Sequence, residues 1–188
     1  GTHPGFTGPV VTLEGTIGNG LSNSGDRLHL IAPDGTVVDA MSYGSDTTEF
    51  DPPCPKVAPG QSLARVPSGL DTDTARDWQV QGEPNPGTAG VAATPTPTSS
   101  VTPSATLTQA ITPSSTPTMT GTPSPTASPT AVVYDPQAVR LNEFLPAPAA
   151  IDWDGNGTAD SRDEWIEIYN TSALAVALGG WQLDSHVL

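Results

Sequence analysis

Short apolar runs, each closed by a turn signal, divide the first ninety residues of the chain. Residues 27–31 (RLHLI) alternate polar and apolar side chains and lead into Pro33-Asp34-Gly35, a strong turn sequence. Residues 36–43 (TVVDAMSY) resume the apolar pattern, so the two runs predict a β-hairpin. Two further strand candidates are residues 61–66 and 77–80. No stretch places apolar residues at helical spacing over more than one turn.

The last part of the chain continues in the same way. Residues 138–145 partly alternate, and residues 164–170 (EWIEIYN) carry the clearest strand signal. On one face of that strand we expect Trp165, Glu167 and Tyr169, and on the other Ile166 and Ile168. A last strand is expected within residues 176–183. Several short strands at this spacing predict an all-β sandwich.

Between these two regions the pattern disappears. Residues 84–134 hold no charged residue, and they repeat Thr-Pro and Ser-Pro pairs, which remove backbone donors and fix φ. Small polar side chains cannot bury enough surface to offset the entropy lost on ordering. We therefore expect a long disordered Thr/Pro-rich tether at residues 91–134, with or without O-linked sugar. It separates an N-terminal segment (residues 1–90) from a C-terminal segment (residues 135–188).

Charge restricts the partners. The chain has 20 Asp and Glu against 6 Lys and Arg, for a net charge of −14. Both segments are acidic, and acidic surfaces repel phosphate groups, so neither nucleic acid nor an anionic membrane surface is expected as a partner. Divalent cations are favoured instead. No run approaches the ~20 apolar residues of a membrane span.

One stretch carries recognisable metal chemistry. In residues 152–163 (DWDGNGTADSRD), carboxylate or amide oxygens recur at the spacing of a twelve-residue calcium loop, and Gly157 stands where that loop turns sharply. The expected calcium ligands are Asp152, Asp154, Asn156, Thr158 through its main-chain carbonyl, Asp160 and Asp163, with Glu164 as the candidate for a bidentate group. No helices flank the stretch, so the alternative is an acidic turn between two strands.

No catalytic constellation emerges from the sequence. The three histidines, His3, His29 and His186, lie near the two ends and in the predicted hairpin, and no nucleophile or phosphate-binding motif accompanies them. Glu164 and Glu167 are three positions apart in a predicted strand, so they face opposite sides. The acidic stretch 71–77 lacks the glycine and spacing of a metal loop and is interpreted as an ordinary loop. We expect that the chain is not an enzyme.

Taken together, four stretches resemble the lamin tail domain, an immunoglobulin-like sandwich of nuclear lamins and of secreted bacterial proteins. Residues 139–145 (VRLNEFL) resemble its opening strand, and residues 164–183 (EWIEIYNTSALAVALGGWQL) its next strands. Residues 21–44 and 59–90 are similar to its later part and its end. The end therefore precedes the beginning. We interpret the chain as the end of one copy and the start of the next, within a longer protein. The resemblance thus implies an immunoglobulin-like β-sandwich that is either incomplete or, if segments 21–83 and 139–183 share one sandwich, circularly permuted.

The resemblance implies a structural or interaction module of a secreted or cell-surface protein. Such a module is expected to be non-catalytic and calcium-stabilised, to lie outside the cell or at its surface, and to serve anchoring or adhesion. Its partner is expected to be a protein or a cell-surface glycan. The alternative is an accessory carbohydrate-binding module of an extracellular hydrolase, for which Trp153, Trp165 and Trp181 are the candidate sugar contacts.

Overall fold

The structure, a computed structural model, describes residues 9–11, 17, 20–88, 132–133, 135–183 and 186–187. The predicted tether lies outside the described residues, apart from positions 132–133, and so does His3. The described part is almost entirely β, with short 3-10 turns between strands. Among the described residues no helix is long and apolar enough to cross a membrane.

The first sheet has the strand order β10-β9-β1-β2. β1 (Gly25–Ile31) and β2 (Val37–Gly44) form the predicted antiparallel hairpin, in which Leu28 lies opposite Met41. The sheet continues with β9 (Gln182–Leu183) and β10 (His186–Val187), both from the C-terminal segment. β1 pairs with β9 directly, with Leu30 opposite Leu183.

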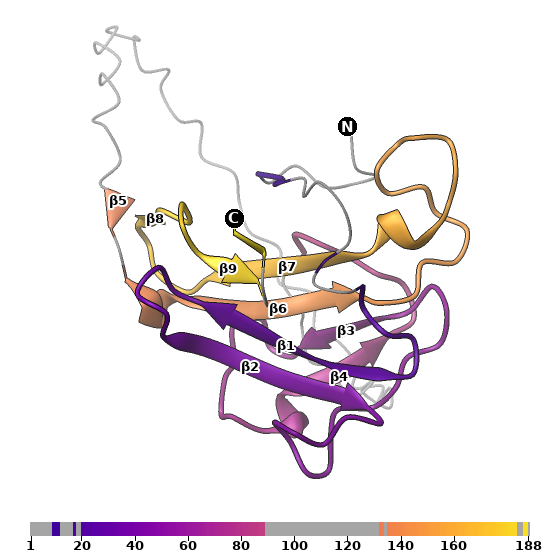
Figure 1. Cartoon of the computed structure of the whole chain (residues 1–188), viewed down its shortest axis with the longest axis horizontal. Coiled ribbons are helices and arrows are strands. Elements are labelled where there is room, and N and C mark those ends of the chain that lie inside the picture. The colour runs from indigo at the N-terminus through magenta and orange to yellow at the C-terminus, as the bar shows by residue number, and fades with distance from the viewer. Residues whose placement is uncertain are drawn as a thin grey trace, which may run out of the picture.

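The second sheet has the order β4-β3-β6-β7. Its strands are β3 (Ser62–Arg65), β4 (Trp78–Gln81), β6 (Val139–Leu145) and β7 (Trp165–Asn170). β3 and β6 pair antiparallel across the two segments, with Leu63 opposite Phe144 (Figure 1). The register of β6 against β7 shifts between Leu141 and Glu143, so this pair contains a bulge.

Smaller elements lie between these strands. β5 (Val132–Val133) pairs in parallel with β8 (Ala175–Val176) and makes a separate two-stranded sheet. The 3-10 turns are η1 (Ala75–Asp77), η2 (Pro136–Ala138) and η3 (Ser161–Asp163). η3 ends the loop that connects β6 to β7, and it therefore positions the last part of the predicted calcium loop.

The apolar faces of the two four-stranded sheets pack together into one core. Buried members from the N-terminal segment include Leu28, Leu30, Met41 and Leu63, and those from the C-terminal segment include Val139, Leu141, Phe144 and Trp181. Ile166 and Ile168, predicted to share one face of β7, both pack against this core. The fold is a β-sandwich, as predicted, and both of its sheets contain strands from both segments.

Candidate metal centre and buried charge clusters

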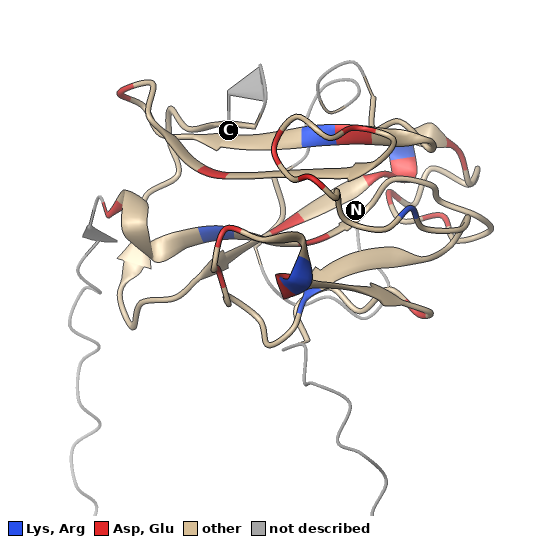
Figure 2. Cartoon of the chain, turned by 90° about the horizontal axis from the view of Figure 1, so that it is seen from below, with Lys and Arg blue, Asp and Glu red and all other residues tan. Residues whose placement is uncertain are grey.

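Acidic residues are spread over the strands and loops of both sheets, and basic residues are few (Figure 2). The loop 152–163 between β6 and β7 carries four of the aspartates. Its first carboxylate, Asp152, accepts N–H groups from Gly155 (2.7 Å) and Asn156 (3.0 Å) on Oδ1, and from Gly157 (2.7 Å) on Oδ2. Gly157 has a φ of +92°, which glycine adopts readily. The chain therefore wraps around the Asp152 carboxylate.

The next two side chains of the loop follow the same inward pattern. Asp154 Oδ1 accepts the Asn156 N–H at 2.9 Å, and Asp154 Oδ2 accepts the Asn156 side-chain amide at 2.7 Å. Asn156 Oδ1 in turn accepts the Thr158 N–H at 2.8 Å. These are local Asx-type contacts, which Asp and Asn favour in tight loops. They hold the side chains of Asp154 and Asn156 next to each other in the loop.

Asp163 closes the loop from its far end. Its side chain is buried, and Oδ1 accepts the N–H groups of Trp153 (2.6 Å) and Asp154 (3.0 Å), while Oδ2 accepts that of Asp160 (2.7 Å). The Trp153 ring packs edge-on against Trp165 of β7, with ring centroids 5.6 Å apart. Asp163 thus ties the start of the loop to its end and to the sheet.

These contacts bring three carboxylates to one point. One oxygen each from Asp152, Asp154 and Asp163 lies within 4.8 Å of the other two. Calcium binds oxygens at about 2.3–2.6 Å, so atoms this close can reach a single ion. All three donors are hard oxygens, and each of the three carboxylates has at least one oxygen that accepts a single N–H group and keeps a lone pair. The donor set therefore fits calcium.

The electrostatics of Asp152 are compatible with this role. Desolvation acts to raise the pKa of this carboxyl, but the N–H groups of Gly157, Gly155 and Asn156 outweigh it and hold the pKa below its ordinary value. A metal ligand must be deprotonated, so a lowered pKa keeps Asp152 available for a cation over a wide pH range.

Two of the predicted ligands lie outside the group of three clustered carboxylates and have other partners. Glu164 does not join the carboxylate cluster, because its Oε2 accepts the main-chain N–H of Leu21 at 3.0 Å. Asp160 Oδ1 accepts the Arg162 N–H at 2.8 Å and so caps η3. Asn156 remains beside the cluster through its bond to Asp154. The Thr158 carbonyl stays a prediction.

The tryptophans do not form an exposed platform. Trp181 is fully buried in the core, and Trp153 is 5% exposed. The indole N–H of Trp165 is also buried, under the contact with Trp153. Sugar-binding tryptophans would present a ring face to solvent, so the expectation of aromatic sugar contacts at these positions is wrong for Trp153 and Trp181.

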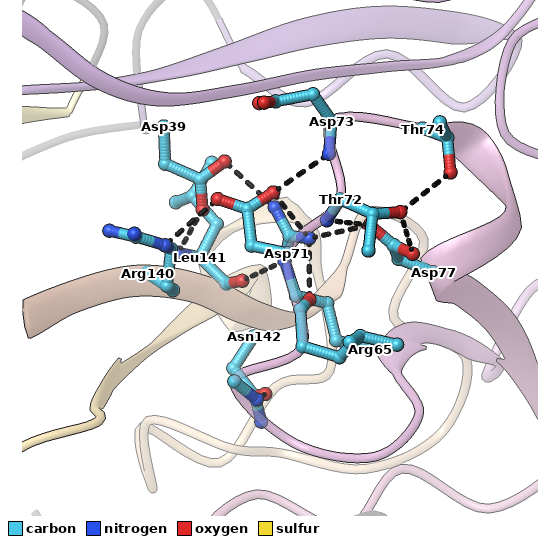
Figure 3. Close-up of polar contacts among 12 residues, drawn as sticks. Asp39, Arg65, Asp71, Thr72, Asp73, Thr74, Asp77, Arg140, Leu141 and Asn142 are labelled. Carbon is cyan, nitrogen blue, oxygen red and sulfur yellow. Dashed lines mark hydrogen bonds and ion pairs between the residues drawn. The ribbon is translucent and has the colours of Figure 1, made fainter. Parts of the chain in front are cut away.

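A second cluster, unforeseen in the sequence, surrounds Arg65 on β3 (Figure 3). Its side chain is fully buried, and its guanidinium ion-pairs with three carboxylates, namely Asp39 (2.8 Å), Asp71 (3.0 Å) and Asp77 (3.3 Å). It also lies over the Trp78 ring, 4.7 Å from the centroid. The stretch 71–77, interpreted above as an ordinary loop, thus supplies two of the three counterions of a buried arginine.

The Arg65 cluster connects the two segments through one residue of β6. Arg65 Nε donates to the Leu141 carbonyl at 2.8 Å, and Asp39 Oδ2 accepts the Leu141 N–H at 2.8 Å. Burial raises the pKa of Asp39 to about 6, although the charge of Arg65 opposes the rise. Asp71 also pairs with Arg140 at 2.8 Å. Because its charged groups are paired with one another and with main chain, the cluster is a structural junction between the sheets.

A third cluster is a pair of carboxyl groups on the outer face of the second sheet. Glu143 of β6 lies directly opposite Glu167 of β7. Glu143 bonds the Ser62 hydroxyl and accepts the Asn85 N–H at 3.2 Å, while Glu167 Oε2 is buried with no hydrogen-bond partner among the described residues. Desolvation raises the pKa of both carboxyls above the ordinary value of 4.5, and the charge of Glu167 adds to the rise at Glu143.

This pair makes stability depend on pH in a defined direction. Between pH 4.5 and the raised pKa values, the folded state holds protons that the unfolded chain has released, so stability falls as pH rises. Glu167→Gln removes one of these charges. We expect higher stability than wild type at pH 7.5 and a weaker loss of stability between pH 5 and pH 7.5, measured by urea unfolding.

The matched control for this change is Glu83→Gln, because Glu83 is an exposed glutamate on the neighbouring stretch of chain. It should leave the pH dependence of the unfolding free energy as in wild type. If Glu167→Gln and Glu83→Gln give the same pH dependence, the buried pair does not set it.

Comparisons of the chain with protein-family models, curated proteins and solved structures found no match.

Proposed function

We propose that this chain is a non-catalytic structural module whose sandwich is stabilised by calcium bound in the loop 152–163. The observation that carries the proposal is the convergence of Asp152, Asp154 and Asp163 within 4.8 Å of one another, in a loop whose main chain already holds their carboxylates inward. Nearby carboxylates repel one another, and a divalent cation offsets that repulsion.

The position of the loop explains why calcium would stabilise the whole module. The loop joins β6 to β7, and Asp163 holds the main chain of Trp153, whose ring packs on Trp165 of β7. An ion that fixes the loop therefore fixes the connection between β6, an inner strand, and β7, an edge strand of the same sheet. A ligand that binds only the folded state raises stability by about 2.7 kcal/mol at a hundred times its Kd.

A structural role also agrees with the state of the reactive side chains. Cys54, the single cysteine, is buried, and desolvation raises the pKa of its thiol to about 12, so it is not a thiolate nucleophile. The imidazole of His29 pairs with the Glu49 carboxylate at 2.9 Å on the surface. The buried acids of the Arg65 cluster are engaged with arginine and main chain.

The place of the module follows from its resemblance to the lamin tail domain of secreted bacterial proteins. We propose that the parent protein is secreted or displayed at the cell surface, and that the module serves anchoring or adhesion there. The partner would be a protein or a surface glycan without strong negative charge, since the chain itself carries −14.

Calcium titration of the full chain tests this proposal. We expect a measurable heat of calcium binding by isothermal titration calorimetry. We also expect the midpoint temperature of unfolding to rise with calcium concentration. Asp152→Asn should abolish most of both effects, because it removes a ligand charge and keeps one oxygen for the loop N–H groups. Asp34→Asn is the control, since Asp34 caps an exposed turn remote in sequence and should leave the calcium response unchanged.

If wild type shows neither binding heat nor a rise in thermal midpoint at millimolar calcium, residues 152–163 are an acidic turn. The same holds if Asp152→Asn and Asp34→Asn respond to calcium as wild type does.

A further inference from the structure

The N-terminal and C-terminal segments meet along a continuous seam that runs through both sheets. In the first sheet the seam is the pairing of β1 with β9, and in the second it is the pairing of β3 with β6. Residues 89–131 link the two segments along the chain, and each of these pairings joins one strand from either side of them.

The centre of the seam is an aromatic side chain held by the opposite segment. Phe144 of β6 is 1% exposed, and its ring lies 4.9 Å from that of Tyr43 and 5.8 Å from that of Trp78. Both partners belong to the N-terminal segment. A buried aromatic anchor in a pocket of complementary rings is what dominates the energetics of interfaces between separate proteins.

Polar contacts surround this anchor and fix its register. Arg65 and Asp39 both bond the main chain of Leu141, and the Gly69 N–H donates to Asn142 Oδ1 at 2.9 Å. Farther along the strand, Ser62 bonds Glu143. Without β6, the buried charges of Arg65 and Asp39 would each lose a main-chain partner, which makes the N-terminal segment specific for this strand.

From this seam we infer that the N-terminal segment is a docking surface for the C-terminal segment of a second copy of this chain. Two copies that exchange their C-terminal segments then form two sandwiches, each built from both chains through the same β1–β9 and β3–β6 pairings. The covalent connection gives each chain's own segment an effective concentration of roughly millimolar, so exchange is expected near that concentration or when the cis partner is defective. The inference rests on the strand pairings and is independent of calcium.

A mixture of two full-length variants tests the exchange. Phe144→Asp disables the C-terminal segment of one chain, and Arg65→Glu disables the N-terminal segment of the other. We expect each variant alone to lack the near-ultraviolet circular dichroism of the folded core. Their equimolar mixture should recover about half of the wild-type signal per chain, because each pair of chains has one intact segment of each kind. Native mass spectrometry should show a heterodimer, and two chains that share the Phe144→Asp lesion should stay unfolded.

A second measurement covers the case in which a variant folds alone. A protease site placed within residues 91–131 allows wild type to be cut between the segments. We expect the two pieces to remain together in native mass spectrometry and, after unfolding and refolding with an isotope-labelled cut copy, to form mixed pairs. Separation of the pieces, or absence of mixed pairs, overturns the inference. So does a mixture of the two unfolded variants that recovers no signal at close to millimolar concentration.

Discussion

Replacement of Arg65 by methionine lowers the free energy of unfolding by about 3–5 kcal/mol, because it leaves buried carboxylates without their counterion. Asp39 and Asp77 lose the partner that lies 2.8 Å and 3.3 Å away, respectively. The Leu141 carbonyl also loses its donor on β3. Methionine fills much of the volume of arginine, so the expected loss reports on the charges more than on a cavity. Urea unfolding followed by tryptophan fluorescence measures the change.

Arg76→Met is the matched control for this result. Arg76 lies on η1, eleven positions along the chain, and its side chain is exposed. Surface substitutions of this kind change stability by about 0.5 kcal/mol or less. Equal effects of Arg65→Met and Arg76→Met would contradict the role assigned to the Arg65 cluster.

Replacement of Phe144 by alanine is expected to cost about 3–5 kcal/mol, through lost burial and the cavity that remains. The ring is almost fully buried and contacts Tyr43 and Trp78 across the seam. The near-ultraviolet circular dichroism of the folded protein should change as well, since both partner rings lose their neighbour. Unfolding free energies from urea titration give the size of the effect.

Leu174→Ala provides the comparison for this second change. Leu174 is 45% exposed and lies in the same C-terminal segment. It should cost less than about 0.5 kcal/mol. A loss at Phe144 no larger than at Leu174 would show that the two segments do not depend on this contact.

The strands could be predicted from the sequence because burial on one face leaves a local, period-two signal. Ile166 and Ile168 of β7 are the clearest instance, and both pack against the core. The inward fold of residues 152–156 was also predictable, since Asx contacts span only a few positions. Features that are set by contacts between residues close in sequence can therefore be predicted from the sequence.

Features that depend on strand pairing could not be predicted in this way. Glu143 and Glu167 are opposite one another only because β6 pairs with β7. Their separation along the chain does not indicate this pairing. Arg65 stands in an apolar run and looks like an ordinary edge position until Asp39 and Asp77 are brought to it from two other elements. An isolated arginine within such a run was the one available signal.

Glu164 shows the same limit within the candidate site. It follows the calcium-type loop directly, and from its position it could have closed the coordination shell. In the structure its carboxylate is instead bonded to Leu21, a residue of the other segment. The contact between the two segments, which no local pattern encodes, decides where this side chain points.

Differential scanning calorimetry of the full chain tests most directly the claim that two distant segments form one sandwich. The account predicts a single endotherm whose calorimetric and van't Hoff enthalpies agree, and which Arg65→Met moves as a whole to lower temperature. Two separate endotherms, only one of which responds to Arg65→Met, would contradict it.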